Sequence, residues 1–394
     1  YLENPDFTLS ADTLGYNTST YQADLVGPTT ILYEEETTIL SSKGWYNTDS
    51  EKSMLLSRSR VIHEDGMTLT GDTIYYDKQL GYGRVLGHME STDSTNHITL
   101  YGNRGEMWEK DRSGYVTDSA LLLDWSDTAQ YVYMHADTLF KEQVAYQYHL
   151  LVPRDSVLVD SVMVAQEADT VWRDSSYMQL RALHGVRIFR EDVQSVCDSA
   201  HYQAKDSIAT LMGDPVCWNQ SNQVSADSIK IFVKDGVVDY LYGSGNAIAI
   251  KQEGENEFNQ LSGTEMYAYM RDGDVYLIEV RGNAETVFYP REEDGSYMGV
   301  NKTQSSFVKL FLRDRQVERV LFTTATSGVM IPLREATDSE RKLSAFFWAE
   351  AERPHQPGDV FLNPERTSRP TKAAVSASTS EDEEEEGKNK KKKQ

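Results

Sequence analysis

The segment Gly71-Asp72-Thr73-Ile74-Tyr75-Tyr76 decides the fold, because versions of it recur along the chain at a fixed spacing. Equivalent segments begin at residues 11, 41, 71 and 102, which are 30, 30 and 31 residues apart. After an interruption they resume at residues 197, 226 and, more loosely, 263. A period of about 30 residues indicates a repeat architecture in which each unit packs on its neighbours.

Apolar residues alternate within each unit with a period of two, which predicts β-strands. The alternation changes phase at the motif: Met67, Leu69 and Gly71 are in phase, and after the motif Ile74 and Tyr76 carry the apolar face. Such a slip predicts a bulge or corner at each Asp-Thr/Ser pair. Small residues begin every motif, which predicts a tight inward corner at Ala11, Ser41, Gly71, Gly102, Ala136, Cys197, Ala226 and Gly263.

A second set of positions follows each motif about 15 residues later, at Gly27, Ser57, Gly87, Asp118, Gly213, Gly243 and Gly282. Each strand therefore has one polar side and one side that must be covered. This pattern is typical of antiparallel sheets packed face to face. We expect an all-β, elongated fold of repeated antiparallel strands.

Composition excludes several classes of protein. The 394 residues carry a formal net charge of -23, which argues against nucleic acid as a partner, since that binding depends on Lys and Arg. No apolar run approaches the length of a membrane-spanning helix. The only cysteines, Cys197 and Cys217, cannot build a disulfide framework, and a bond between them stays open. The chain begins at Tyr1 without a signal segment and is interpreted as a mature fragment.

The period divides the chain. We expect repeats at residues 1–140 and 181–335, separated by an insert at 141–180 that forms either an extra hairpin or a mobile loop. Thr337-Asp338-Ser339-Glu340 resembles a capping box and predicts a short helix at 336–354 that caps the open end of the sheet stack. Residues 363–394 end in acidic and basic blocks and are expected to be disordered.

No catalytic motif is recognisable, and the eight histidines are scattered, so we expect no enzymatic activity, no metal site and no cofactor. Aspartates recur once per unit, and a paired-acid hydrolase would need two of them across a cleft. The alternative is that each aspartate holds its corner by hydrogen bonding to a neighbouring backbone amide. These aspartates are Asp12, Asp72, Asp137, Asp198 and Asp227.

The apolar inner face is either a filled core or a groove for lipid, and the sequence leaves both open. If the two sheets do not close completely, the residues expected to contact lipid are Leu14, Tyr16, Leu25, Ile31, Ile74, Tyr76, Val85, Met89, Met107, Leu122, Leu211, Ile229, Ile231, Val280 and Phe288.

The repeated unit Ala/Gly-Asp-Thr/Ser-Leu/Ile-x-Tyr, followed by an apolar-x-Gly-x-apolar strand, resembles the OstA-like repeat of LptA-type periplasmic lipopolysaccharide-transport proteins. Longer strings resemble the large OstA-like proteins of Bacteroidota. These strings run from Gly27 to Ile31, Gly44 to Thr48, His135 to Leu139, Asn259 to Gly263 and Asn301 to Phe307.

The resemblance implies a half-open β-jellyroll, or β-taco, in which two facing sheets hold the lipid A chains of lipopolysaccharide. It implies a periplasmic location, outer-membrane association, and end-to-end pairing of edge strands with other transport-bridge or outer-membrane assembly proteins. The length, insert, helix and acidity of this chain differ from the small bridging proteins. These differences leave room for an envelope scaffold with a filled core that binds other proteins through strand edges. A third alternative is an enzyme on a β-solenoid that acts on polysaccharide and would need converging acids or a metal site.

Asp-Thr/Ser followed by an aliphatic residue is similar to the O-glycosylation acceptor motif of exported Bacteroidota proteins. Strand corners alone can generate most copies of this pattern. The candidates nearer to loops are Thr128, Ser156, Ser161 and Thr170.

Overall fold

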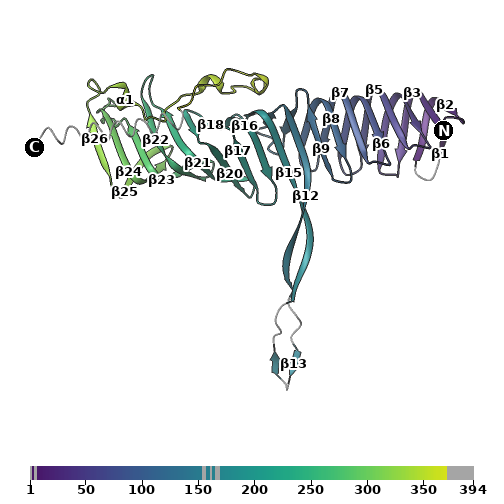
Figure 1. The fold of residues 1–394 in the computed structure, drawn as a ribbon, viewed down its shortest axis with the longest axis horizontal. Helices are drawn as coiled ribbons and strands as arrows, with labels where there is room; N and C mark the ends of the chain where they lie inside the picture. Colours follow the sequence, from purple (N-terminus) through teal and green to yellow (C-terminus); the bar gives the residue numbers. More distant parts are fainter. Residues whose placement is uncertain (1, 4–6, 153–156, 160–161, 165–168, 371–394) are drawn as a thin grey trace, which may run out of the picture.

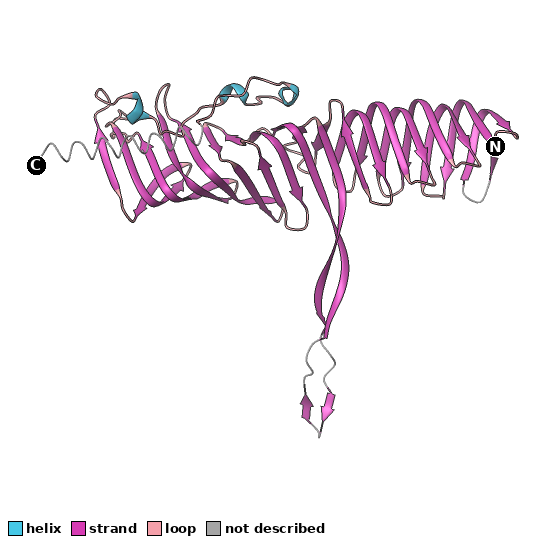
Figure 2. Cartoon of the chain, viewed as in Figure 1, coloured by secondary structure: helices cyan, strands magenta, loops and turns pink. Residues whose placement is uncertain are grey.

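A computed structural model describes residues 2–3, 7–152, 157–159, 162–164 and 169–370. Twenty-four strands form one antiparallel sheet that runs the length of the molecule, and β13 and β14 form a separate pair (Figures 1 and 2). The predicted all-β, half-open β-jellyroll is confirmed. The facing layers expected to be two sheets are halves of a single sheet folded lengthwise.

The strands follow the chain in order from the N-terminus. The first half contains β1 Leu2–Glu3, β2 Phe7–Asn17, β3 Gln22–Tyr33, β4 Thr37–Asn47, β5 Lys52–His63, β6 Met67–Asp77, β7 Tyr82–Asp93, β8 Ile98–Trp108, β9 Ser113–Thr117, β10 Leu121–Asp124, β11 Val132–His135, β12 Thr138–Val152, β13 Val157–Val159 and β14 Val162–Val164. The second half contains β15 Asp169–Phe189, β16 Gln194–Gln203, β17 Ile208–Met212, β18 Val216–Asn219, β19 Asn222–Ser225, β20 Ser228–Lys234, β21 Val237–Gln252, β22 Phe258–Arg271, β23 Asp274–Phe288, β24 Val300–Arg313, β25 Gln316–Thr323 and β26 Ser327–Ile331.

Each full-length strand bends near its middle, and the bends fold the sheet into two facing wings. The pairing of β2 with β3 shifts between Ala11 and Thr13, and the pairing of β3 with β4 shifts between Val26 and Thr29. We call the wing that contains residues 7–11 and 29–33 wing A, and the wing that contains residues 13–17 and 22–26 wing B. The line of bends is the spine, and the opposite side, where the turns lie, is the mouth.

Some units interrupt the strand at the spine instead of bending it. The strand β8 pairs with β10 through residues 98–101 and with β9 through residues 104–108, so β9 and β10 together take the place of one bent strand. Two short strands replace one bent strand in the same way at three further places: β11 and β12, β17 and β18, and β19 and β20.

Each predicted corner is formed by two sequence features, one on each of two adjacent strands. The first is the Asp-Thr/Ser motif, and the second is a residue with positive φ at Gly27, Gly87, Gly213, Gly245 and Gly282. The Asp227 N–H donates to the Gly245 carbonyl at 2.7 Å, so Gly245 and not the expected Gly243 is the trailing corner residue. A Cβ at Gly71, Gly102 or Gly263 would overlap a valine Cγ1, which explains why only small residues fit there.

Two of the corner aspartates, Asp72 and Asp227, bind side chains across the spine, where a bond to a backbone amide was expected. Asp72 lies 2.6 Å from Nδ1 of His88. The Asp227 carboxylate accepts a 3.0 Å hydrogen bond from Nδ2 of Asn246. Each of these two aspartates therefore contacts a histidine or an asparagine of the neighbouring bend.

The insert at 141–180 forms a long hairpin in its described part. Residues 138–152 of β12 pair with residues 169–183 of β15, and the ribbon projects beyond the rim of wing B (Figure 1). We call this projection the arm. The last pairing between β12 and β9 joins Lys141 to Gly114, so beyond Lys141 the strand β12 pairs with β15 alone.

The expected helix at 336–354 is much shorter than predicted. The α-helix α1 spans Asp338–Arg341, and the Glu340 carboxylate accepts hydrogen bonds from the N–H and the hydroxyl of Thr337, as in the predicted capping box. At Lys342 the backbone becomes extended. The side-chain amide of Gln260 donates to the Arg341 carbonyl at 2.7 Å and accepts from the Leu343 N–H at 2.8 Å. These backbone groups are therefore not available to continue the helix.

Residues 342–370 form a segment that we call the strap, and it lies along the outer face of wing A instead of capping the sheet end (Figure 1). Its two turns are the 3-10 helices η1 Glu350–Glu352 and η2 Pro357–Phe361. Phe347 and Ala349 pack on outward side chains of β16, β18 and β21, which include Val196, Val216, Trp218, Ile248 and Ile250. Leu343 packs in the same way on Val287, Tyr289 and Val300.

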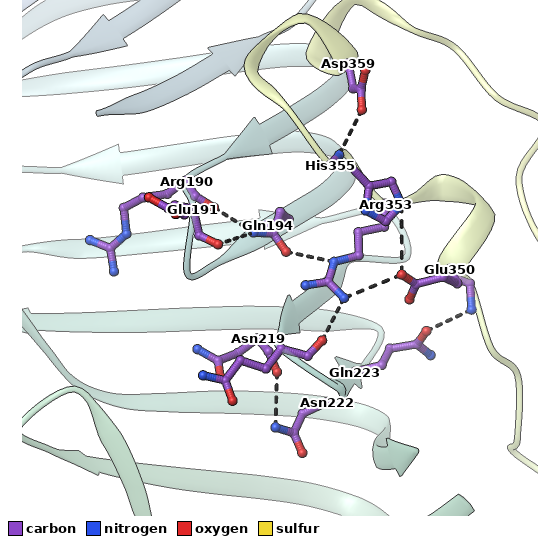
Figure 3. Close-up of polar contacts among 12 residues, drawn as sticks. Arg190, Glu191, Gln194, Asn219, Asn222, Gln223, Glu350, Arg353, His355 and Asp359 are labelled. Carbon is purple, nitrogen blue, oxygen red and sulfur yellow. Dashed lines mark hydrogen bonds and ion pairs between the residues drawn. The ribbon is translucent and has the colours of Figure 1, made fainter. Parts of the chain in front are cut away.

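Buried polar side chains of the sheet hold the strap. The side-chain amide of Gln223 is fully buried. It donates a hydrogen bond to the Phe347 carbonyl and accepts one from the Ala349 N–H, both at 2.8 Å. Arg353 donates to the Gln194 side chain at 2.8 Å and to the Gln220 carbonyl at 2.7 Å (Figure 3). Such contacts define a single position for the strap, because an unpaired buried amide is costly.

The expectation of disorder from residue 363 is wrong for the first eight residues. Arg366 pairs with the buried carboxylate of Glu352 at 3.1 Å, and Arg369 lies over the Phe347 ring. The remaining part of the predicted tail, 371–394, lies outside the described residues.

The outer face of wing B is less polar than expected. Aromatic side chains of adjacent strands contact one another there in a row made of Tyr75, Tyr82, Trp108, Tyr115 and Phe140. Cross-strand aromatic contacts of this kind stabilise a sheet. Many tyrosines of this chain therefore support the sheet from outside.

Candidate lipid-binding trough

The inner faces of both wings form a continuous apolar interior, which we call the trough. In the first half its buried residues are Leu9, Leu25, Leu55, Ile74 and Val85. A second buried cluster begins at Val116, near the end of the first half, and extends to Val308 in the second half. Met89 packs against both clusters, so the interior continues from one half of the molecule to the other.

Strand alternation places all fifteen predicted contact residues on the inner face, at different depths. The buried ones are Leu25, Ile74, Val85, Leu122, Leu211, Ile229 and Val280. The half-buried ones are Leu14, Ile31, Tyr76, Met89, Ile231 and Phe288. Tyr16 and Met107, near the mouth in wing B, are 49% and 40% exposed. The trough therefore has a buried floor at the spine and apolar side chains that reach solvent at the mouth.

A cavity of about 70 Å³ lies between the wings near the middle of the molecule. Its lining is mostly apolar, with a polar side formed by Ser91, Asp93 and Lys141. The apolar lining consists of Met67, Ile98, Leu100, Leu122, Met178 and Leu180. Of these nine residues, only Leu122 was among the predicted contacts.

Several contacts join the wings across the mouth in the first half. Phe7 at the start of β2 meets Tyr46 at the end of β4 edge to face, with ring centroids 5.9 Å apart. Glu34, in the turn after β3, lies 3.8 Å from Lys78, in the turn after β6. Asp93 of β7 and Lys141 of β12 form an ion pair of 3.4 Å. These strands are not neighbours in the sheet, so each contact bridges opposite wings.

The surroundings of Asp93 and of Tyr76 determine whether each side chain is ionised. Burial of Asp93 favours its neutral form, yet the hydrogen bonds from Asn96 and the charge of Lys141 hold its pKa below the ordinary value. Burial raises the pKa of Tyr76, and its hydroxyl donates to Glu109 at 2.8 Å. Asp93 is therefore ionised, and Tyr76 is neutral, near pH 7.

The two cysteines are buried in the trough as free thiols. Burial raises the pKa of Cys197 to about 12 and that of Cys217 to about 11. The Cys217 Sγ lies 3.4 Å from the Ser195 hydroxyl. The sequence left a bond between the two cysteines open; in this structure both are reduced and behave as small apolar groups.

Nothing in the described part of the chain resembles a metal centre, because no three His, Cys, Asp or Glu side chains there could hold one ion. The described residues also include no helix long and apolar enough to span a bilayer.

The candidate glycosylation residues are only partly visible. Thr128 is exposed in the connection between β10 and β11. Thr170 belongs to β15, opposite Leu151 of β12. Ser156 and Ser161 lie outside the described residues.

Sequence comparison adds no relative: no family model matches the chain, and no curated protein matches it. Among solved structures, the chain is similar to LptH of Pseudomonas aeruginosa, described as the periplasmic component, homologous to LptA, of the lipopolysaccharide transport device. That similarity has 14% identity and a TM-score of 0.29, and it covers 36% of this chain and 99% of LptH. At these values, the function has to be argued from the trough itself.

Proposed function

We propose that this chain is a non-enzymatic periplasmic protein that holds the acyl chains of lipopolysaccharide in its trough and assists their transfer to the outer membrane. The observation that carries the proposal is the exposure of apolar inner-face side chains, Tyr16 and Met107, along a trough whose floor is buried. Burying apolar surface that is otherwise in water is the main favourable contribution to lipid binding.

The folded sheet suits a ligand with long chains. Its interior is lined by side chains from both wings along most of its length, and it contains a cavity at mid-length. An acyl chain needs continuous apolar contact and few specific polar partners. The resemblance of the repeats to LptA-type transport proteins supports lipopolysaccharide as the lipid and the periplasm as the compartment.

Photocrosslinking tests the proposal. A photoreactive amino acid at Tyr76 or Ile231, both on the inner face, should label lipopolysaccharide in cells, and mass spectrometry of protein purified from its native envelope should detect the bound lipid. A photoreactive residue at Val26, which is 55% exposed on the outer face of β3, is the matched control. Labelling of protein alone from the inner positions would refute lipid binding.

A second candidate function is an envelope scaffold that binds proteins through strand edges. The observation in its favour is the edge of β2, because among the described residues β1 covers just residues 8 and 9 of this strand. Unpaired edge strands bind other strands by β-augmentation. A further photoreactive residue placed on β2 separates the two functions, since a scaffold would give protein crosslinks from that strand and no lipid in the extract.

A further inference from the structure

We infer that the ion pair between Asp93 and Lys141 is a latch on the mouth of the trough, and that acyl chains enter and leave the interior beside it. The inference rests on the proposed lipid-binding function and names the place where the ligand crosses the rim.

Asp93 and Lys141 lie in opposite wings. Asp93 ends β7 in wing A, and Lys141 belongs to β12 in wing B, with other strands between them in the sheet. Strand pairing therefore does not force the two side chains together. Their ion pair forms only while the wings face each other closely.

The ion pair borders the cavity between the wings. Both residues of the ion pair line the cavity, and the apolar side chains of Leu100 and Leu122 line it closer to the spine. Opening the pair would connect this space with solvent at the mouth. Ion pairs of the second half, such as Lys309 with Glu279 and Arg315 with Asp274, join residues within wing B and would not obstruct the mouth.

The ion pair can separate without leaving a buried charge unpaired. The Asp93 carboxylate also accepts hydrogen bonds from the backbone N–H and the side-chain amide of Asn96, at 3.0 and 2.7 Å. The Lys141 side chain is 39% exposed, so its ammonium group can move into water. A carboxylate with other partners and a solvated lysine suit a contact that opens and closes.

Lys141 lies where β12 loses one of its two neighbouring strands. Lys141 is the last residue of β12 that pairs with β9, and from there the strand continues into the arm. A strand with one neighbour bends more easily than one held on both sides. The rim of wing B is thus weakest at the residue that closes the mouth.

Release kinetics of a fluorescent fatty acid, an undecanoic acid that carries a dansyl group, test the latch in the full chain. Asp93→Asn and Lys141→Met should each speed release about two- to fivefold and leave the bound amount at saturation unchanged. The exchanged pair, Asp93→Lys with Lys141→Asp, should return the rate toward the original value. Lys309→Met, which removes an ion pair within wing B, is the matched control.

Salt provides a second measurement on the same samples. Raising the ionic strength from about 50 mM to about 500 mM should speed release from the original protein and not from the single variants, because screening weakens the pair. Unchanged rates in both single variants, or an equal effect of Lys309→Met, would overturn the latch.

A thiol reporter separates failure of the latch from failure of the proposed function. In a Leu100→Cys protein, the new thiol faces the cavity, and its modification by a small maleimide reports opening without any lipid. Asp93→Asn should speed that modification. If the fatty acid binds to none of the proteins, lipid binding is refuted, and the thiol rate alone decides the latch; an unchanged thiol rate rejects it.

Discussion

The carboxylate of Asp72 lies 2.6 Å from Nδ1 of His88, and this contact ties the bend of β6 to the bend of β7 at the spine. The equivalent aspartate of the first unit, Asp12, faces Gly27, which is followed by Pro28 instead of histidine. The two bends therefore differ in electrostatics and also in backbone, because His88 has a φ of 43° and proline cannot adopt a positive φ.

The hydrogen bond from His88 holds the pKa of Asp72 below its ordinary value. A depressed carboxyl pKa stabilises the fold above the unfolded-state value of about 4, and this contribution is lost as the pH falls through the lower, folded-state pKa. We expect Asp72→Asn to make stability less dependent on pH between about 5 and 2. Urea unfolding across that range measures it, with Asp12→Asn as the control. Equal slopes for the two variants and the original protein would contradict the assignment.

Gly71 has no room for a side chain. A Cβ there would overlap Cγ1 of Val85 on the next strand, inside the trough. We expect Gly71→Ala to lower the free energy of unfolding by about 1–3 kcal/mol, because overpacking forces neighbouring atoms to move. Gly15→Ala on β2 is the control, since its Cβ would have an ordinary 4.0 Å contact with Asp24. Thermal unfolding of both proteins gives the comparison, and equal stability would show that the spine adapts.

The amide of Gln223 should determine whether the strap stays in place. Gln223→Met keeps the size of the side chain and leaves the Phe347 carbonyl and the Ala349 N–H without partners. Each unpaired buried group costs about 1–3 kcal/mol, so hydrogen exchange in residues 343–353 should accelerate strongly. Gln304→Met on β24, which removes an exposed bond to Glu285, should have little effect. Exchange that is unchanged in the first variant would mean that apolar packing alone holds the strap.

Apolar side chains at the mouth should matter for lipid and little for folding. Tyr16 and Met107 are 49% and 40% exposed, so Tyr16→Asp and Met107→Asp should each change the free energy of unfolding by less than about 1 kcal/mol. A charge there opposes the entry of acyl chains, and we expect weaker fatty acid binding in a fluorescence titration. Val26→Asp, on the outer face, should bind as the original protein does. Equal binding by all three variants would place the lipid elsewhere.

The thiols should be inert in the folded protein. With the pKa of Cys197 at about 12 and that of Cys217 at about 11, very little thiolate exists at pH 8. Iodoacetamide should therefore modify both cysteines at least about 100-fold more slowly than an exposed cysteine, and at the normal rate in urea. Rapid modification of the folded protein would show that the trough opens widely.

The alternating pattern of each unit was sufficient to predict strands, inner faces and corners. The change of phase between Gly71 and Ile74 corresponds to the register shift between β5 and β6, because a bulge always moves side chains to the other face. The arm was harder to predict: residues 141–180 carry no motif, so the sequence could not distinguish a paired ribbon from a loop. Met178, Leu180 and Lys141 were missed as cavity residues for that reason.

The strap could not be predicted, because its conformation depends on partners far away in the sequence. Leu343, Phe346 and Phe347 have helical spacing, and an isolated segment with this pattern would favour a helix. Two buried glutamines, Gln223 and Gln260, take its backbone groups instead. Tertiary contacts of this kind override local preference, and no spacing rule in the sequence connects residue 223 with residue 349.

Because every bent strand supplies part of both walls, the cross-section of this molecule is set by a single unit and its length by the number of units. Gain or loss of one pair of strands would lengthen or shorten the trough while each remaining layer kept its neighbours. The arm obeys the same rule, since it prolongs two strands outward past the rim and leaves their pairing within the wall untouched. Such a design lets evolution change the length of the trough without changing its cross-section.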